Sequence, residues 1–379
     1  MLRAKKIAFL KTGSMSHVNA SVARMLEQSF PEAEIEVVDA GALLFSRKSL
    51  AFRVFGRLHA YRECGRLIFL RGHKSRDCVR WTRYRFDKVR RTLANHLAGR
   101  DYAFTFQTES LFDGSQPGIP HFVYTGHATL SDLEMPGFDK RDLLPRSWIE
   151  LEAGIYRNAR LVFTFSNHIA RCVVEGYGCP ADKVICVGAG SNSNPRPGAP
   201  PDAARYASKN ILFVGIYWKR KGGPVLVEAF KRVLKVHPDA QLTIVGCSPE
   251  LNIANCRVVG KVPLEQVNKY YERAAVFCLP TTDEPFGLVF IEAFSHRLPV
   301  VAPPIAAVPD FLKDGENGYL VKADDVETLA NRLIELIGNP AKCQALGENG
   351  YALFREKYNW ERVGSRIRQE IVRAIGYTD

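Results

Sequence analysis

Short apolar runs alternate along this chain with longer segments of helical periodicity, and this alternation constrains the fold more than any other feature. The first apolar run, residues 6–10, is followed by a turn at 12–14 and a helical segment at 18–30. Further strands are expected at 35–38, 102–106, 120–124, 161–165 and 184–187, and a second set over residues 211–321. Short apolar strands joined by helices are typical of parallel sheets covered on both faces. The sequence therefore predicts an α/β fold with doubly wound layers.

The length of 379 residues indicates two domains, because single hydrophobic cores stop growing at about 250–300 residues. Residues 191–210 hold four prolines and few large apolar side chains, which is typical of an interdomain linker. We therefore expect a first domain over residues 1–195 and a second over residues 205–360. The helical pattern that closes the chain predicts a C-terminal helix, residues 361–379.

The composition is that of a soluble globular protein, with 46% hydrophobic and 24% charged residues. Nine cysteines are scattered without a CxxC pair or a spacing for metal ligands, so we expect buried thiols in a reducing compartment. Met1 and the residues after it lead directly into a strand, so the sequence predicts no signal peptide. No apolar run approaches the roughly 18 residues of a membrane span. These features together predict a cytoplasmic protein.

The net charge of +12 is concentrated in one segment, from Arg47 to Arg91. That segment contains 15 of the 52 basic and 3 of the 40 acidic residues, so the remainder, 37 of each sign, is neutral. Aromatic residues are interleaved with these charges. Such a pattern suits an anionic membrane surface, a phosphorylated lipid or polysaccharide acceptor, or nucleic acid. No nucleic-acid motif accompanies it, so we expect an acceptor-side or membrane-facing patch and no nucleic-acid partner. The alternative is a pair of solvated helices whose aromatic side chains pack inward.

Two glutamates flank a predicted helix start within residues 281–321. Glu284 precedes the residues PFGL (285–288), and Glu292 follows in the helical run. The first backbone N–H groups of a helix have no internal partner and suit a diphosphate. Glu284 would then face sugar hydroxyls, and Glu292 would face ribose hydroxyls on the other side of the diphosphate. The alternative is a solvated acidic loop before an amphipathic helix, because proline and charge are ordinary at helix starts.

A second motif, KRKGG at residues 219–223, follows a predicted strand at 211–215. The negative charge of a bound diphosphate needs a metal or protein donors to balance it. The chain contains no DxD sequence to hold such a metal. Lys221 is the expected replacement, with Arg220 or Lys219 as a second cation, and the glycines allow close backbone approach to phosphate. The alternative is an exposed basic turn.

A Rossmann dehydrogenase is the main competing α/β enzyme, and the sequence argues against it. That fold requires GxGxxG after an early strand and an acidic residue about 20 positions later. The first turn offers only Gly13, and the pair Gly222-Gly223 follows a lysine. We therefore discard this class.

These blocks together resemble the signature of the retaining glycosyltransferases of family 4 (group 1 type), which have the fold called GT-B. The resemblance rests on the EPFGL block through Glu292, on PVVA at 299–302 and GENGYLV at 315–321, on KRKGG, and on residues 162–187. It spans about half of the chain in the family's order. It implies an α/β GT-B fold: an acceptor-side and a nucleotide-sugar-binding Rossmann-like domain facing a cleft, with the C-terminal helix crossing back to the first.

The resemblance also implies a set of site residues. Glu284, Lys221 and His127 are expected to be catalytic. His127 follows an apolar strand and matches the first-domain histidine that touches the donor sugar near the reacting carbon. The donor-binding residues that the resemblance implies are Gly13, Ser14, Arg220, Lys221, Phe286, Gly287, Leu288, Glu292, Lys261 and Val262. The nucleotide base is expected near residues 245–246 and 260–262, which leaves uracil and guanine both open.

Three positions depart from the family's pattern. Ile216 stands where the family usually has arginine, Gly126 stands where an aspartate usually precedes the histidine, and Gly13 stands where a pair of glycines is common. The identity of the second cation and the role of Gly13 therefore remain open. Glu109 and Arg171 are further candidates for the cleft without an assigned role.

The expected activity is transfer of a sugar, with retention of anomeric configuration, from a nucleotide-diphosphate sugar to a glycan or lipid-linked acceptor in cell-surface polysaccharide synthesis. Attack on the front face, with the leaving phosphate taking the acceptor proton, needs no dedicated protein base. No metal and no cofactor besides the donor substrate are expected. Residues 47–91 would hold the protein peripherally at the inner face of the membrane. The alternative is a non-catalytic sugar-nucleotide or glycan-binding protein on the same scaffold.

Overall fold

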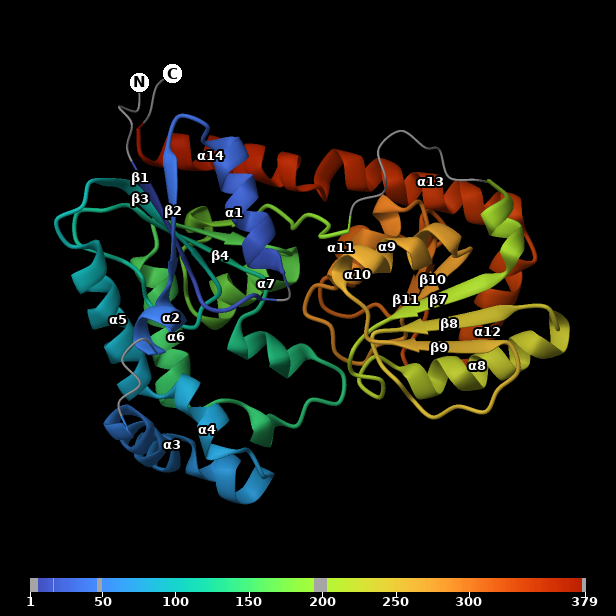
Figure 1. Cartoon of the computed structure of the whole chain (residues 1–379), viewed down its shortest axis with the longest axis horizontal. Coiled ribbons are helices and arrows are strands. Elements are labelled where there is room, and N and C mark those ends of the chain that lie inside the picture. The colour runs from blue at the N-terminus through green and yellow to red at the C-terminus, as the bar shows by residue number, and fades with distance from the viewer. Residues whose placement is uncertain (1–5, 16, 46–49, 194–202, 377–379) are drawn as a thin grey trace. The chain divides into compact units, whose positions relative to one another are not determined.

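A computed structural model describes residues 6–15, 17–45, 50–193 and 203–376 (Figure 1). The chain divides into two compact units. Unit 1 consists of residues 1–134, 138–188 and 360–379, and unit 2 consists of residues 135–137 and 189–359. The change from one unit to the other falls between Gly188 and Ala189, just before the predicted linker. Residues 194–202 of that linker lie outside the described residues.

Unit 1 is built on a parallel six-stranded sheet in the order β2-β1-β3-β4-β5-β6. The strands are β1 (Lys6–Lys11), β2 (Glu34–Asp39), β3 (Tyr102–Thr108), β4 (His121–Thr125), β5 (Leu161–Thr164) and β6 (Val184–Cys186). The helices are α1 (Val18–Ser29), α2 (Ala40–Phe45), α3 (Leu50–Arg71), α4 (Ser75–Cys78), α5 (Arg83–Leu97), α6 (Arg146–Asn158), α7 (Asn167–Arg171) and α14 (Trp360–Ala374). The expected short apolar strands and helical connections are therefore present.

The core of unit 1 is rich in phenylalanine along its central strands. Phe106 on β3 lies opposite Phe9 of β1 and Phe122 of β4 in the strand registers. The ring of Phe163 on β5 stacks on the rings of Phe106 and Phe122 at centroid distances of 6.3 Å and 6.2 Å. All four side chains are fully buried. Their burial on both faces explains why these strands read as continuous apolar runs.

The C-terminal helix α14 packs against α1 within unit 1 (Figure 1). A Cβ atom at Gly364 would lie 2.3 Å from Ser29 Oγ, so the absence of a side chain there allows the close approach of the two helices. Arg368 Nη1 donates to the Ser29 carbonyl at 2.8 Å, and Arg366 Nη2 donates to the Cys186 carbonyl at 2.8 Å. These contacts attach the end of the chain to the first sheet and its first helix.

Unit 2 repeats this architecture with a parallel six-stranded sheet in the order β12-β11-β10-β7-β8-β9. The strands are β7 (Asn210–Val214), β8 (Gln241–Val245), β9 (Cys256–Gly260), β10 (Val276–Cys278), β11 (Val300–Ala302) and β12 (Gly318–Leu320). The helices are α8 (Gly223–Val236), α9 (Leu264–Arg273), α10 (Leu288–Ser295), α11 (Val308–Phe311), α12 (Val326–Ile337) and α13 (Pro340–Lys357).

Each sheet has one point at which the order of the strands reverses. In unit 1 the chain runs outward from β1 to β2 and then returns to the other side of β1 with β3. In unit 2 it runs from β7 through β8 to β9 and returns to the other side of β7 with β10. Loops that leave the carboxyl ends of such strands diverge to opposite faces of the sheet, and ligands of α/β proteins bind between them. A ligand site is therefore expected between the loops after β1 and β3 in unit 1, or between those after β7 and β10 in unit 2.

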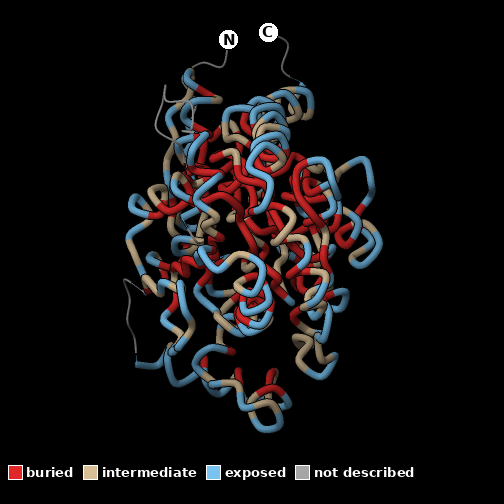
Figure 2. Tube along the Cα trace, turned by 90° about the vertical axis from the view of Figure 1, so that its right-hand side faces the viewer, coloured by how far each residue is buried: buried red, intermediate tan, exposed pale blue. Residues whose placement is uncertain are grey.

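The nine cysteines are free thiols, and seven of them are buried. The expectation that all nine are buried is wrong for Cys186 and Cys256, which are half-buried. Both lie on edge strands, β6 and β9, where one side of the strand has no neighbour in the sheet. Figure 2 colours the described residues by burial, and the buried residues gather in the interior while the exposed residues lie around the outside of the trace.

Candidate functional site

The loop after β7 is a tight turn that places Lys221 at the switch point of unit 2, the point where the strand order reverses between β7 and β10. The backbone N–H of Lys221 donates to the Tyr217 carbonyl at 2.8 Å, and that of Gly223 donates to the Trp218 carbonyl at 3.0 Å. Gly222 has a φ of 74° and caps the start of α8. These bonds fix the backbone of the KRKGG motif, so the position of Lys221 is determined by the turn itself.

Both glycines of that motif are required by packing. A Cβ atom at Gly222 would lie 1.8 Å from the carbonyl oxygen of Pro280, and one at Gly223 would lie 2.2 Å from the ring of Trp218. No side chain fits at such distances. Gly222 therefore allows the β7 loop to contact Pro280, and Gly223 allows the loop to pack against its own Trp218.

The loop after β10 is bonded to the β7 loop. The carbonyl of Arg220 accepts bonds from the Thr282 N–H at 3.0 Å and from the Thr281 hydroxyl at 3.2 Å. The same Thr281 hydroxyl donates to the Asp283 carbonyl at 3.0 Å. The two loops thus form one rigid assembly at the reversal of strand order.

Two ion pairs join these loops. Lys221 Nζ contacts Glu284 Oε2, and the two side chains are only 10% and 13% exposed. Arg220 Nη1 donates to Asp283 Oδ2 at 2.8 Å, with both side chains 39% exposed. The sequence predicted site roles for Lys221, Arg220 and Glu284, and the structure brings the three together. Lys219 has no such contact among the described residues.

Helix α10 begins at Leu288, four residues after Glu284. Gly287 precedes it with a φ of 87°, and a Cβ atom there would lie 2.4 Å from the Phe290 ring and 3.0 Å from Glu284 Cγ. The glycine therefore allows the carboxylate to lie against the helix start, where unpaired N–H groups carry partial positive charge. Leu288, the first residue of the helix, is half-buried.

Phe286 was predicted to contact the donor, but its side chain is packed inside unit 2. It is 5% exposed, and its ring lies 5.7 Å from that of Phe311 and 6.4 Å from that of Tyr358. This aromatic packing anchors the loop between Glu284 and α10. The side chain of Phe286 is therefore an anchor of this loop.

Glu292 lies about one turn into α10 and is 5% exposed. Its Oε2 accepts a hydrogen bond from the Tyr271 hydroxyl at 3.0 Å, and the Tyr271 ring stacks on His296 at 5.2 Å. Burial raises the pKa of the Glu292 carboxyl to about 7. Burial also lowers the pKa of His296 to about 3, so this imidazole stays neutral. Glu292 thus titrates near neutrality.

The carboxyl ends of β7, β8 and β9 converge at three glycines. Gly246 N donates to the Gly260 carbonyl at 2.8 Å, and a Cβ atom at Gly246 would lie 2.8 Å from the Gly215 carbonyl oxygen. Lys261, which follows β9, is exposed, and Val262 is half-buried. No contact among the described residues joins either of them to Lys221 or Glu284.

The switch point of unit 1 holds a second group of polar residues. Gly13, with a φ of 57°, follows β1, and its carbonyl accepts bonds from Asn19 Nδ2 at 3.0 Å and Lys11 Nζ at 3.2 Å. Ser14, the next residue, is exposed. Thr12 in the same turn donates through Oγ1 to Glu109 Oε2 at 3.0 Å.

Glu109 directly follows β3 and has a φ of 66°, a conformation that non-glycine residues seldom adopt. Its backbone N–H donates to the Tyr124 carbonyl at 3.1 Å, and burial raises the pKa of its carboxyl. Its position therefore rests on both neighbouring strands and on the turn after β1. Arg171, the other unassigned candidate, donates to Glu134 at 3.1 Å.

His127 follows β4, and its Nε2 lies 2.7 Å from Asp132 Oδ1 with 45% of the side chain exposed. The preceding residue, Gly126, lies against Phe165, and a Cβ atom there would lie 2.5 Å from that ring. An aspartate before the histidine, as in the family's usual pattern, does not fit this packing. Asp132 provides a carboxylate to the imidazole from five residues further along the chain.

Comparisons with known proteins agree with this geometry. Residues 208–339 match the model of the family "Glycosyl transferases group 1". The solved structure of sucrose-phosphate synthase from Thermosynechococcus elongatus is similar with a TM-score of 0.71, at 17% identity over 98% of this chain and 99% of that chain. The chain is a relative of the group 1 glycosyltransferases and has the GT-B fold.

Two curated relatives and a further structure extend this GT-B comparison. Phosphatidyl-myo-inositol mannosyltransferase of Mycobacterium leprae is 34% identical over 179 residues, which cover 44% of this chain and 48% of that protein. D-inositol 3-phosphate glycosyltransferase of Corynebacterium jeikeium is 27% identical over 269 residues, 63% of this chain and 64% of that protein. The Anabaena protein Alr3699/HepE, in complex with UDP and glucose, is similar with a TM-score of 0.65 at 14% identity, over 97% and 99% of the two chains. This chain spans about half to two thirds of the length of these curated relatives.

Sequence reasoning missed several residues of this GT-B chain that hold the site together. Thr281 and Asp283 lie within three residues of Glu284 in the sequence, so their position was a usable signal. Tyr271 carried no signal, because it reaches Glu292 from another helix, 21 residues earlier. Asp132 carried none either, since nothing local ties it to His127.

None of the described helices combines the length and apolar character that crossing a bilayer requires. Within the same residues, no group of three or more His, Cys, Asp or Glu side chains is arranged to hold a metal ion.

Proposed function

We propose that this chain is a retaining, hexosyltransferase-like glycosyltransferase of family 4, which transfers a sugar from a nucleotide-diphosphate sugar to a glycan or lipid-linked acceptor. The observation that supports this most is the buried Lys221–Glu284 pair at the point where strand order reverses in unit 2. A buried ion pair is costly to desolvate and gives little stability. Its placement at a binding edge therefore favours a role in a ligand site over a role in folding.

In the proposed reaction Lys221 stabilises the negative charge that develops on the leaving diphosphate. The turn that contains Gly222 and Gly223 fixes the position of Lys221 before the reaction begins. The protein therefore does not have to reorganise around the developing charge as the bond breaks. The N–H groups at the start of α10 add partial positive charge, as the backbone of residues 286–288 permits. Arg220 is the proposed second cation, since it lies beside Lys221 and pairs with Asp283.

Glu284 accepts hydrogen bonds from the sugar hydroxyls and fixes the orientation of the anomeric carbon. Glu292 accepts from the ribose, and the residues around Gly246, Lys261 and Val262 contact the base. His127 contacts the donor sugar, and Gly13 and Ser14 lie against the diphosphate or the acceptor, as the family resemblance implies. The acceptor attacks the front face of the anomeric carbon, and the leaving phosphate takes its proton. No metal and no further cofactor takes part in this scheme.

The proposed acceptor carries phosphate or lipid, and the product belongs to a cell-surface polysaccharide or glycolipid. The names of two curated relatives, which refer to phosphatidyl-myo-inositol and D-inositol 3-phosphate, support an acceptor of this kind. The charge of residues 47–91 supports it as well.

We also propose that the protein works in the cytoplasm, bound peripherally to the inner face of an anionic membrane through α3. Helix α3 exposes the large apolar side chains of Leu50, Val54, Phe55, Leu58, Tyr61, Phe69 and Leu70, each at least 44% exposed. The helix carries five arginines and one glutamate. An apolar face flanked by arginines suits the boundary between headgroups and acyl chains.

Thermal denaturation in the presence of UDP, GDP, ADP and TDP tests the donor site, with each nucleotide added with and without chelator. UDP is tried first, because the Anabaena protein binds it. Stabilisation by one diphosphate that is indifferent to chelator, and absent in Lys221→Met, is the expected result. No shift with any nucleotide would contradict the proposed donor site and favour a non-catalytic glycan-binding protein. Inverted anomeric configuration in a product would contradict the front-face reaction.

A further inference from the structure

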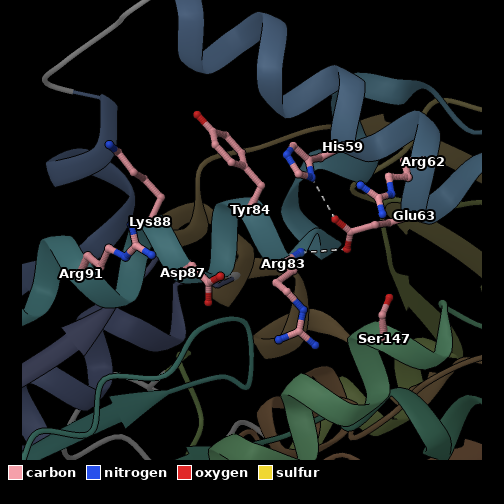
Figure 3. A pocket seen from close by; sticks show the side chains of 9 residues that line it. All are labelled: His59, Arg62, Glu63, Arg83, Tyr84, Asp87, Lys88, Arg91 and Ser147. Carbon is pink, nitrogen blue, oxygen red and sulfur yellow. Dashed lines mark hydrogen bonds and ion pairs between the residues drawn. The ribbon is translucent and has the colours of Figure 1, made fainter.

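The groove between α3 and α5 in unit 1 has a chemistry that the donor site does not use. It encloses about 500 Å³ and is lined by His59, Arg62, Glu63, Arg83, Tyr84, Asp87, Lys88, Arg91 and Ser147. Figure 3 shows the residues of α3 on one side, those of α5 on the other, and Ser147 of α6 at one end. Four cations against two carboxylates leave a balance of +2 in this groove.

The carboxylate of Glu63 differs from the cations of the groove in its contacts. Glu63 accepts a bond from the Arg83 backbone N–H at 2.9 Å and lies 3.4 Å from His59 Nδ1. By contrast, within the described part of the chain no carboxylate pairs with the side chain of Arg62, Arg83, Lys88 or Arg91. Elsewhere in unit 1 arginines do find partners, as Arg71 does with Asp142 at 2.6 Å. The groove therefore presents unpaired cations to a ligand.

The walls of the groove are held in place by aromatic packing. The Tyr84 ring stacks on His59 with centroids 4.9 Å apart and planes 10° apart, and it lies 5.6 Å from the Phe52 ring. This stack fixes α3 and α5 relative to each other. The cations on the two helices consequently face a preformed space.

The groove borders the exposed apolar stripe of α3. Leu50, Val54, Leu58 and Tyr61 recur at helical spacing before the kink of α3 at Cys64, and Phe69 is exposed after the kink. Arg62, which lines the groove, is four residues after the stripe residue Leu58, and residues at this spacing are neighbours on a helix surface. A headgroup in the groove would thus leave its acyl chains beside apolar side chains.

We propose that this groove binds the phosphomonoester headgroup of an anionic membrane lipid, with the acyl chains against the α3 stripe. A phosphomonoester carries a charge of about −1.5 to −2 at neutral pH, which matches the balance of +2. A free soluble phosphate offers the same charge, but it would leave the stripe exposed to water, so the lipid is the occupant that accounts for both observations. This inference deepens the membrane attachment in the proposed function and rests on it.

Vesicle binding by the full chain tests the inference without donor or acceptor. Phosphatidylcholine vesicles contain either phosphatidic acid or phosphatidylserine, mixed to equal surface charge. The variant Lys88→Gln/Arg91→Gln removes two groove cations. The matched control, Arg24→Gln/Arg157→Gln, removes two exposed charges from α1 and α6. We expect the wild type and the control to prefer phosphatidic acid about tenfold, and the groove variant to lose that preference while still binding both vesicles.

Four outcomes would overturn the inference. If the wild type binds both kinds of vesicle equally, surface charge alone accounts for the binding. The groove then has no headgroup specificity, and only the proposed membrane attachment remains supported. No binding to either vesicle removes the membrane attachment as well, while leaving the donor site untouched. Competition by glycerol 3-phosphate as strong as that of the lipid assigns the groove to a soluble phosphate. Concentration-dependent dimers in sedimentation, abolished by Leu58→Gln, assign the stripe to a second copy of the chain.

Discussion

Lys221 and Glu284 form an ion pair, with 10% and 13% of their side chains exposed, although 63 residues separate them in sequence. The pair exists because β7 and β10 are neighbours in the sheet and because the loops that follow them are hydrogen-bonded. A diphosphate bound at the start of α10 would compete with Glu284 for the ammonium group. The carboxylate would then be released toward the sugar, which makes the pair the centre of the proposed donor site.

Replacing Glu284 with glutamine should lower kcat by about 100-fold or more while the protein stays folded. The amide keeps the shape of the side chain but loses the charge that orients the sugar and balances Lys221. Glu335→Gln is a matched control, since Glu335 pairs with Lys342 on the helices α12 and α13 of the same unit. Turnover with a nucleotide-sugar donor and far-UV circular dichroism measure the two effects. A Glu284→Gln protein with nearly full kcat would remove Glu284 from the site.

Replacing Gly222 with alanine should destabilise the protein by about 3 kcal/mol or more and weaken diphosphate binding. The new Cβ would meet the Pro280 carbonyl at 1.8 Å, and the φ of 74° adds backbone strain. Gly99 has a φ of 72° with no atom within 4 Å, so Gly99→Ala carries only the strain, about 1 kcal/mol. Denaturant unfolding compares the two variants. Equal losses would show that packing at Pro280 contributes nothing.

Restoring the aspartate that the family usually has before the histidine should harm this protein. In Gly126→Asp the side chain would collide with the Phe165 ring, and overpacking of this kind costs about 1–3 kcal/mol. The variant Gly126→Asp/Phe165→Leu should recover part of the stability, because leucine frees the space. Thermal unfolding of the single and double variants measures this. A Gly126→Asp protein as stable as the wild type would contradict the packing argument.

Glu292 should make stability fall as pH rises from about 4.5 to about 7. Burial raises the pKa of its carboxyl in the folded state to about 7, so the folded protein holds a proton that the unfolded chain has lost. The folded state is therefore favoured by this group at low pH and loses that advantage as pH passes through 7. Glu292→Gln, which cannot ionise, should gain on the wild type by up to about 3 kcal/mol at pH 8 and little at pH 4. Parallel pH dependence of unfolding in both proteins would contradict this assignment.

Polar substitutions on the α3 stripe should release the protein from anionic vesicles without unfolding it. Val54 and Leu58 are 56% and 62% exposed, so Val54→Gln/Leu58→Gln removes little buried area. We expect vesicle affinity to fall about tenfold or more. Val37→Gln/Val236→Gln changes two residues of similar exposure on β2 and α8 and should bind as the wild type does. Vesicle co-sedimentation measures both, and equal binding by the two variants would argue against the stripe.

The sequence could predict the elements of this fold because their signals are local. The apolar run at residues 6–10 becomes β1, and the helical pattern at 18–30 becomes α1, since burial of a strand or a helix face shows within one or two turns of the chain. The EPFGL and KRKGG motifs gave Lys221, Arg220 and Glu284 as site candidates for the same reason. Glycine, lysine and glutamate at the end of a predicted strand form a pattern that can be recognised within a few residues of sequence.

Only the tertiary structure decided which residues of these elements come into contact. The strand order places Lys221 beside Glu284, seals Phe286 among Phe311 and Tyr358, and puts Tyr271 over Glu292. Packing against Phe165, seen only in three dimensions, explains why Gly126 replaces an aspartate. Local pattern determines whether a segment is a strand or a helix. Strand pairing and burial join residues far apart in the chain, and these set the ion pairs, the raised pKa of Glu292 and the cation-lined groove.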